Sequence, residues 1–216
     1  MNKIKLLVGG AFLAFVGYSA LTDTESDYDA VGYQGGEPDY YGIMDRMVVV
    51  AEAYSEGIAQ MAAEQGVTAP EGEAVLADAN MMAQFTDTFE TAINEQPALY
   101  SVPMGVTLLD NGVFRGFEDT DGDGEKGMTE AGLWTLEVDE ANERLVLTTE
   151  GERRYGFSGI GTGLIAGAIL GNVMGRQRAS GVNPGRFASA NVSNRSASQA
   201  RSARSSARTG GARTGK

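Results

Sequence analysis

The chain has 216 residues, with 29 acidic and 17 basic side chains but neither cysteine nor histidine. The lack of both residues excludes disulfide frameworks, thiol nucleophiles, Ser-His-Asp triads and structural zinc sites, so any bound metal must be held by oxygen. The net charge of −12 is uneven, because residues 1–175 carry a net charge of −21 whereas residues 176–216 carry nine bases and no acid.

Residues 1–22 have the pattern of an export signal. Lys3 and Lys5 precede a run of 17 uncharged residues, 6–22, and an acid-rich segment follows. A basic segment before an apolar one is typical of a signal peptide, and this length also reaches the lower limit of about 17–25 residues for a membrane-spanning anchor. The sequence therefore predicts export and leaves a cleaved signal and an uncleaved anchor open. A buried helix of a cytosolic protein is the less favoured alternative.

Two helices are predicted after an acidic linker. Residues 23–42 are rich in glycine and poor in aliphatic side chains, which predicts the linker. From residue 43, apolar residues recur at helical spacing up to Gly66, and a second helix is expected between a capping pair at Thr68 and Glu71 and a stop at Pro97. Its apolar stripe, expected to be core, consists of Val75, Met82, Phe85, Phe89 and Ile93.

After Pro97, apolar residues begin to recur at about every second position, which predicts strands. Residues 106–109 and 113–117 flank Asn111-Gly112, a pair typical of a type I′ hairpin turn, and residues 134–138 and 144–149 form a second hairpin. The predicted fold class is α+β, with a helical hairpin packed on a small antiparallel β-meander. We assign this domain to residues 43–154.

The loop between the two predicted hairpins, residues 119–130, reads DTDGDGEKGMTE. Three aspartates stand at positions one, three and five, a glycine stands at position six, and a glutamate stands at position twelve. This spacing resembles the calcium loop of an EF-hand. The predicted ligands of a Ca²⁺ cofactor are Asp119, Asp121 and Asp123, the carbonyl of Glu125 and both oxygens of Glu130, with Gly124 at the sharp turn and a water-mediated position at Gly127.

The segments that flank this loop are predicted strands, and Lys126 occupies a position at which EF-hands usually carry an aliphatic residue. The loop therefore looks more like the EF-hand-like calcium loops of bacterial surface proteins, in which the ion rigidifies the fold. An acidic turn that binds no ion is the alternative.

Residues 155–175 carry the second distinctive pattern. The 21 uncharged residues between Arg154 and Arg176 would span about 32 Å as a helix, enough for a bilayer core of about 30 Å. Glycines recur at every fourth position: Gly159, Gly163, Gly167, Gly171 and Gly175. The repeat resembles the glycine-zipper segments of bacterial envelope proteins, which implies a transmembrane helix that packs against a copy of itself or another membrane helix. A soluble glycine-rich linker is the alternative.

Residues 176–216 are rich in Arg, Ser, Ala and Gly, which predicts a disordered basic tail. Such a tail is expected to bind anionic lipid or, nonspecifically, nucleic acid. With a membrane span before it, the positive-inside rule places the tail in the cytoplasm and the acidic domain outside the inner membrane.

Together these features predict a non-enzymatic, membrane-anchored protein of the bacterial cell envelope that acts as a structural or interaction module. A pore-forming or membrane-remodelling oligomer is one alternative, and a carboxylate-dependent hydrolase is another. No catalytic residue is predicted, because no spacing singles out an acid and a base.

Overall fold

The computed structural model describes residues 36–64, 79–160, 167–183, 185–187 and 190–196. The predicted signal or anchor in residues 1–22 lies outside them, as do most of the predicted linker and residues 197–216 of the predicted tail. The described helices are α2 (Tyr40–Glu64), α3 (Ala79–Asn94) and α5 (Ala168–Ala179), with a short 3-10 helix η1 (Glu140–Asn142). The strands are β1 (Met104–Leu108), β2 (Phe114–Glu118), β3 (Gly132–Asp139), β4 (Arg144–Thr149), β5 (Arg154–Ser158) and β6 (Ser193–Ser196).

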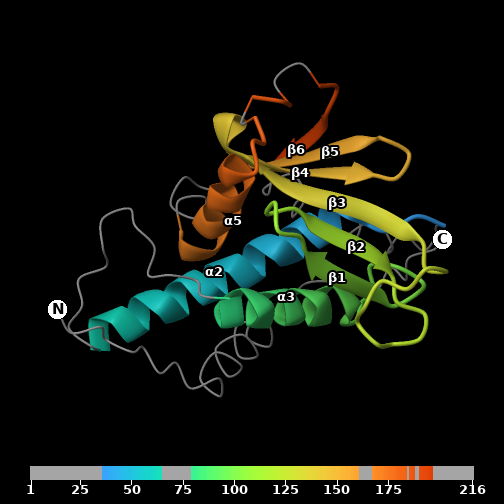
Figure 1. Ribbon diagram of the computed structural model, residues 1–216, viewed down its shortest axis with the longest axis horizontal. Helices are drawn as coiled ribbons and strands as arrows, with labels where there is room; N and C mark the ends of the chain where they lie inside the picture. Colours follow the sequence, from blue (N-terminus) through green and yellow to red (C-terminus); the bar gives the residue numbers. More distant parts are fainter. Residues whose placement is uncertain (1–35, 65–78, 161–166, 184, 188–189, 197–216) are drawn as a thin grey trace, which may run out of the picture.

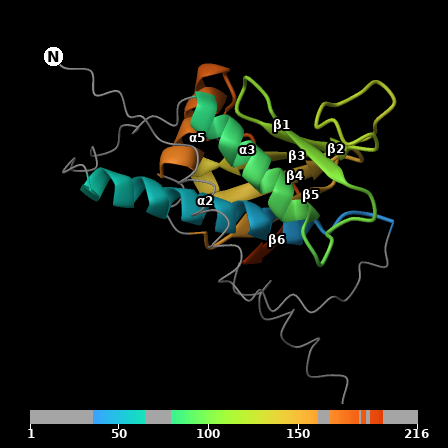
Figure 2. The same ribbon diagram turned by 90° about the horizontal axis from the view of Figure 1, so that it is seen from below.

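The six strands form one sheet in the order β1-β2-β3-β4-β5-β6. Neighbouring strands are antiparallel as far as β5, and β6 runs parallel to β5. The helices α2 and α3 lie side by side along the sheet, and α5 crosses near α2 (Figures 1 and 2). The α+β class and both predicted hairpins are confirmed. The sheet, however, is larger than the predicted meander and is mixed.

The hydrophobic core lies between the helices and one face of the sheet. The predicted stripe of α3 is confirmed, because Met82, Phe85, Phe89 and Ile93 are all buried, whereas Val75 lies outside the described residues. The Phe85 ring lies 5.9 Å from that of Phe114 on β2, and the Phe89 ring lies 6.2 Å from that of Trp134 on β3. These aromatic contacts connect α3 to the centre of the sheet.

Helix α2 begins at Tyr40, three residues before its predicted start at residue 43. The carboxylate of Asp39 accepts a hydrogen bond from the Gly42 amide at 3.0 Å, as an N-cap residue does. The ring of Tyr40 then packs 4.9 Å from that of Tyr155 on β5. The linker boundary was predicted too late because Asp39 was counted with the acidic linker when it caps the helix.

The turn between β1 and β2 is not the predicted type I′ turn. That type needs positive φ at both central residues, and here only Gly112 has one, at 74°. The Gly112 amide donates to the Leu109 carbonyl at 2.9 Å, and the Val113 amide donates to Asn111 Oδ1 at 3.2 Å. The connection is therefore a tight turn that ends in a left-handed glycine. Helix α5 also contacts this turn, because Gln177 Nε2 donates to the Gly112 carbonyl at 3.2 Å.

The transmembrane helix predicted for residues 155–175 is not what the structure contains. Residues 154–158 form strand β5, in which Phe157 is fully buried opposite Leu145 of β4. Gly159 follows with a φ of 79°, a value incompatible with a right-handed helix. Within the described parts of the chain, no helix is both long and apolar enough to cross a membrane.

The glycine repeat is also divided among different structures. Gly159 follows strand β5, Gly163 lies outside the described residues, and Gly167 is the N-cap of α5, so only Gly171 and Gly175 lie within that helix. The described apolar side chains of this segment that lie on α5 belong to the core. Those buried on α5 are Ile169, Leu170, Val173 and Met174.

The described residues between 176 and 196, predicted as part of a disordered cytoplasmic tail, fold with the acidic domain. Arg178 forms an ion pair with Glu140, and the Arg195 guanidinium lies 4.3 Å from the centre of the Tyr41 ring. Strand β6 completes the sheet beside β5. The opposite charges of the two parts of the chain therefore contact each other here, and a membrane between residues 154 and 176 does not fit this fold.

Candidate metal centre

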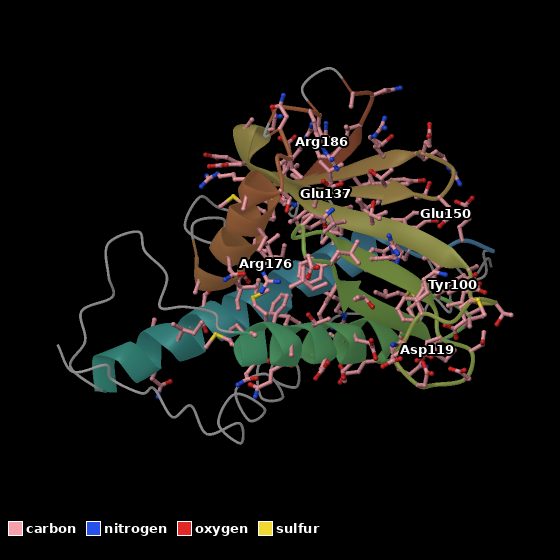
Figure 3. The ribbon with its side chains drawn as sticks, in the orientation of Figure 1. Tyr100, Asp119, Glu137, Glu150, Arg176 and Arg186 are labelled. Atoms are coloured by element: carbon pink, nitrogen blue, oxygen red, sulfur yellow. The ribbon has the colours of Figure 1, made fainter. Side chains whose placement is uncertain are left out.

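The predicted calcium loop lies between β2 and β3 and is fixed at its first residues by the fold. The Asp119 amide donates to the Pro103 carbonyl, and the Glu118 amide donates to the Ala131 carbonyl, both at 2.9 Å. The Tyr100 hydroxyl donates to Glu118 Oε1 at 2.8 Å (Figure 3). Because these contacts join the loop to strands and to the segment before β1, its first carboxylate has a defined position.

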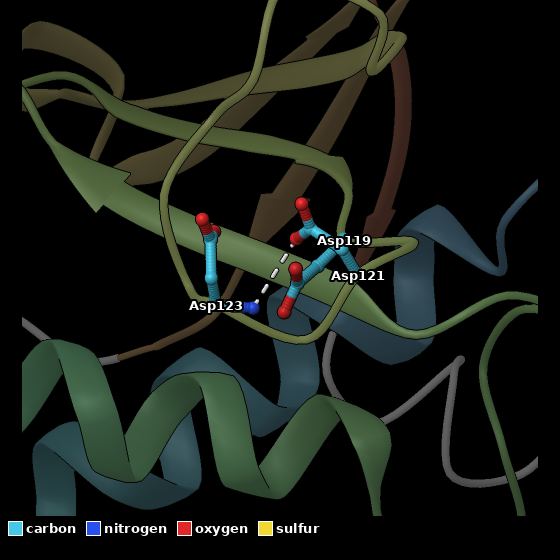
Figure 4. A group of neighbouring side chains, drawn as sticks. All are labelled: Asp119, Asp121 and Asp123. Carbon is cyan, nitrogen blue, oxygen red and sulfur yellow. Dashed lines mark hydrogen bonds between the residues drawn. The ribbon is translucent and has the colours of Figure 1, made fainter.

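Three predicted ligands converge in this loop. One carboxylate oxygen each from Asp119, Asp121 and Asp123 lies within 4.8 Å of the other two (Figure 4). Asp119 is buried, and the other two side chains are exposed. Each carboxylate also accepts a loop amide: Gly122 donates to Asp119 at 3.0 Å, Asp123 to Asp121 at 3.3 Å and Glu125 to Asp123 at 2.7 Å. A carboxylate has about four acceptor positions, so these bonds leave room for a cation.

Two glycines give the loop its tight curvature. Gly124, at loop position six, has a φ of 72°, as its predicted turn requires, and Gly122 has a φ of 76°. Left-handed backbone of this kind favours glycine because other side chains clash there. The role of Gly122 was missed from the sequence, although the Asp-Gly pair at 121–122 is a turn signal.

Glu130, the predicted bidentate ligand, is buried and held by the loop itself. Its Oε1 accepts the Thr120 amide and its Oε2 accepts the Gly127 amide, both at 2.8 Å. These amides, that of Gly127 first, lower the pKa of Glu130 below its usual value and so favour the carboxylate. Glu130 is not one of the three converging residues, and its Oε1 also accepts the Thr120 hydroxyl at 3.3 Å. The carbonyl of Glu125 remains a predicted ligand.

The chemistry of this loop suits a hard divalent cation. The converging ligands are carboxylate oxygens, which Ca²⁺ and Mg²⁺ prefer. The loop's own lysine, Lys126, donates to the Glu130 carbonyl at 2.7 Å. A dication would relieve the repulsion among the three aspartates, and a loop of many oxygens favours Ca²⁺, which accepts 6–8 ligands in flexible geometry.

Glu90 on α3 links the helical layer to β1, and the charge of Asp119 acts on it. Its Oε2 accepts the Val106 amide of β1 at 2.8 Å, so the side chain covers part of the sheet edge. Burial raises the pKa of Glu90; the Val106 hydrogen bond opposes this rise, and the charges of Asp119 and Asp87 add to it. The sequence did not single out Glu90, because nothing local shows that α3 lies near the loop.

Replacing Glu90 by Gln is expected to stabilise the calcium-free protein near neutral pH. The amide oxygen can still accept the Val106 hydrogen bond, so the change mainly removes a partly buried charge. Because the pKa is raised in the folded state, wild-type stability should fall as pH rises from below 4.5 through the folded-state pKa. The gain in melting temperature should therefore be larger near pH 7 than below pH 4.5, and should shrink when calcium neutralises Asp119.

Glu56→Gln on the exposed face of α2 removes the same charge and serves as the control. A gain for Glu90→Gln that is unchanged by calcium would show that Glu90 does not respond to the charge of the loop.

Comparison with known protein families, curated proteins and solved structures finds no match for this chain. The assignment of the loop as a candidate metal centre therefore rests on its own geometry, which is a cluster of three aspartates able to hold a metal ion.

Proposed function

We propose that this protein is a non-enzymatic component of the bacterial cell envelope whose exported domain binds calcium in the loop 119–130. The ion would join the end of β2 to the start of β3 and stabilise the sheet. The observation that carries the proposal is the convergence of Asp119, Asp121 and Asp123 in a loop that strand contacts hold in place.

The expected affinity is that of an extracellular structural site. Asp121 and Asp123 are exposed, so water competes for the ion, and the described residues hold no second cluster of this kind beside the loop. Calcium sites of extracellular modules have dissociation constants of about 10⁻⁴–10⁻³ M. A protein exported through the signal in residues 1–22 would meet calcium at such concentrations, which is why the two predictions support each other.

Membrane attachment in this proposal comes from residues 1–22, because residues 154–158 and 168–179 belong to the folded domain. The tail would then lie on the same side of the inner membrane as the domain. Its last five bases, Arg201, Arg204, Arg208, Arg213 and Lys216, would attract anionic lipid headgroups near the anchor. The pore-forming alternative needs one continuous glycine-striped helix, whereas residues 154–158 form a strand.

Terbium luminescence tests the metal site directly, since Tb³⁺ is a luminescent substitute for Ca²⁺. Tyr100 is a suitable sensitiser because its hydroxyl bonds to Glu118, the residue before the first ligand. Excitation of tyrosine should produce saturable terbium emission that calcium displaces. Tyr100→Phe should remove most of the sensitised emission and leave calcium binding intact.

Tyr41→Phe, near β6, is the matched control and should keep the emission. Emission that survives the double change Asp121→Asn with Asp123→Asn would place the terbium outside the proposed loop.

A further inference from the structure

A cavity of about 550 Å³ opens on the face of the sheet that points away from the helices. Its floor consists of Thr135, Glu137, Thr148 and Arg154 on β3 to β5. These residues alternate with core residues such as Trp134 and Leu136, so they point to the opposite face. The segment between α5 and β6 covers one side with Arg186, Phe187 and Ala190. The volume is within the range of about 300–1,000 Å³ typical of small-molecule sites.

The strand register places the polar groups of the floor in one row. Thr135 of β3 is directly opposite Thr148 of β4, and Thr148 is directly opposite Arg154 of β5. Two hydroxyl groups therefore lie beside a guanidinium on one pleated surface. A guanidinium with adjacent hydroxyl donors is a common way to bind the oxygens of an anion.

The charge balance of the cavity favours an anion. Glu137 has only 4% of its surface exposed and is ion-paired with Arg186, so these two charges largely cancel (Figure 3). Burial raises the pKa of Glu137, while Arg186 and Arg154 act in the opposite direction. Arg154 takes part in none of the four ion pairs within the described part of the chain, although its charge acts on Glu137. The cavity thus retains one positive charge that can bind a ligand.

We propose that this cavity binds a small organic anion whose carboxylate or phosphate group pairs with Arg154. The hydroxyl groups of Thr135 and Thr148 would donate to the same anionic group, and the apolar part of the ligand would lie against Phe187 and Ala190. The lining contains a single carboxylate, Glu137, which is ion-paired with Arg186. The lining therefore favours binding of a ligand over acid–base chemistry on it. This site is separate from the calcium loop and does not depend on it.

Amide NMR of the full ¹⁵N-labelled chain tests the proposal, with inorganic phosphate and acetate as separate probes at constant ionic strength. At least one probe should shift the amides of the cavity residues Thr135, Thr148, Arg154 and Phe187 in a saturable way. Sodium chloride at the same ionic strength should not. Saturation by phosphate alone or by acetate alone identifies which anionic group the site prefers.

Arg154→Gln should weaken the binding about tenfold or more, because the charged donor is lost. Arg115→Gln is the matched control: Arg115 lies opposite Thr135 on β2 in the same cross-strand row, but does not line the cavity. It should leave the affinity unchanged. Thr148→Val, which keeps the shape of the side chain, should also weaken binding and provides a second variant.

The proposal is overturned if neither probe gives saturable shifts at the cavity. It is equally overturned if Arg154→Gln and Arg115→Gln change the affinity to the same extent, since the binding would then reflect general surface charge.

Discussion

Ile169→Ala should lower the free energy of unfolding by about 2–5 kcal/mol, the usual cost of truncating a fully buried aliphatic side chain. Ile169 has no exposed surface and belongs to the core cluster. Its helix, α5, packs against α2 and β3. A membrane helix that turned this side chain towards lipid would lose little from the same change, because lipid would fill the space.

Gly175→Ala is the informative counterpart on the same helix. Gly175 is exposed, and a Cβ atom there would have no neighbour within 4 Å. Alanine is the better helix former, so this variant should be more stable by about 0.5–1 kcal/mol. In a glycine stripe that packs helices together, the added methyl group would instead weaken the association.

Urea unfolding of the full chain followed by circular dichroism measures both effects. An Ile169→Ala variant as stable as the wild type, together with a destabilised Gly175→Ala variant, would contradict the packing of α5 described above.

Calcium should stabilise the folded protein by a free energy comparable to the loss expected for Ile169→Ala, and so raise its melting temperature. At a calcium concentration of about 100 times the dissociation constant, one site that binds only the folded state adds about 2.7 kcal/mol. For a chain of this size this corresponds to about 5–10 °C. Asp121→Asn with Asp123→Asn should abolish the increase. It should leave the calcium-free protein at least as stable, since each amide oxygen can still accept its turn hydrogen bond.

Asp110→Asn with Glu143→Gln removes two exposed acids outside the loop and should keep the full calcium effect. Equal calcium-dependent stabilisation of the two double variants would mean that calcium acts on the net charge of the protein and not at the loop.

The features that could be predicted from the sequence depend on residues close together in the chain. The stripe of α3 follows from one helical period, and the hairpin β3–β4 follows from alternation over a few residues. The converging aspartates also lie within twelve residues, so their spacing was sufficient to indicate the cluster. In each case the residues that form the local sequence pattern are also the ones that make the contacts in the fold.

The C-terminal part was mispredicted because the glycines of its repeat share a spacing but not a structural role. Gly156, outside the repeat, allows close packing within the sheet, since a Cβ atom there would lie 2.1 Å from Asn194 Oδ1. Gly159 takes a left-handed φ, and Gly167 caps α5. An uncharged run of 21 residues therefore contained the strand β5 and the start of a core helix, each too short to recognise by hydropathy.

Strand β6 and the cavity could not be predicted, because they depend on contacts between distant residues. Arg144 Nη1 donates to Asn194 Oδ1 at 2.8 Å, and its Nε donates to Asp139 Oδ2 at the same distance. This buried network attaches the parallel strand β6 to the sheet across 50 positions of sequence. No local period marks Ser193–Ser196 as a strand.

Isothermal titration calorimetry of the metal-free full chain measures directly whether loop 119–130 binds calcium. We predict saturable binding of one calcium ion per chain, with magnesium binding more weakly, and loss of the signal in the variant that combines Asp121→Asn with Asp123→Asn. Calcium binding of undiminished affinity in that variant, or no binding by the wild type at millimolar calcium, would show that the loop is not a calcium site.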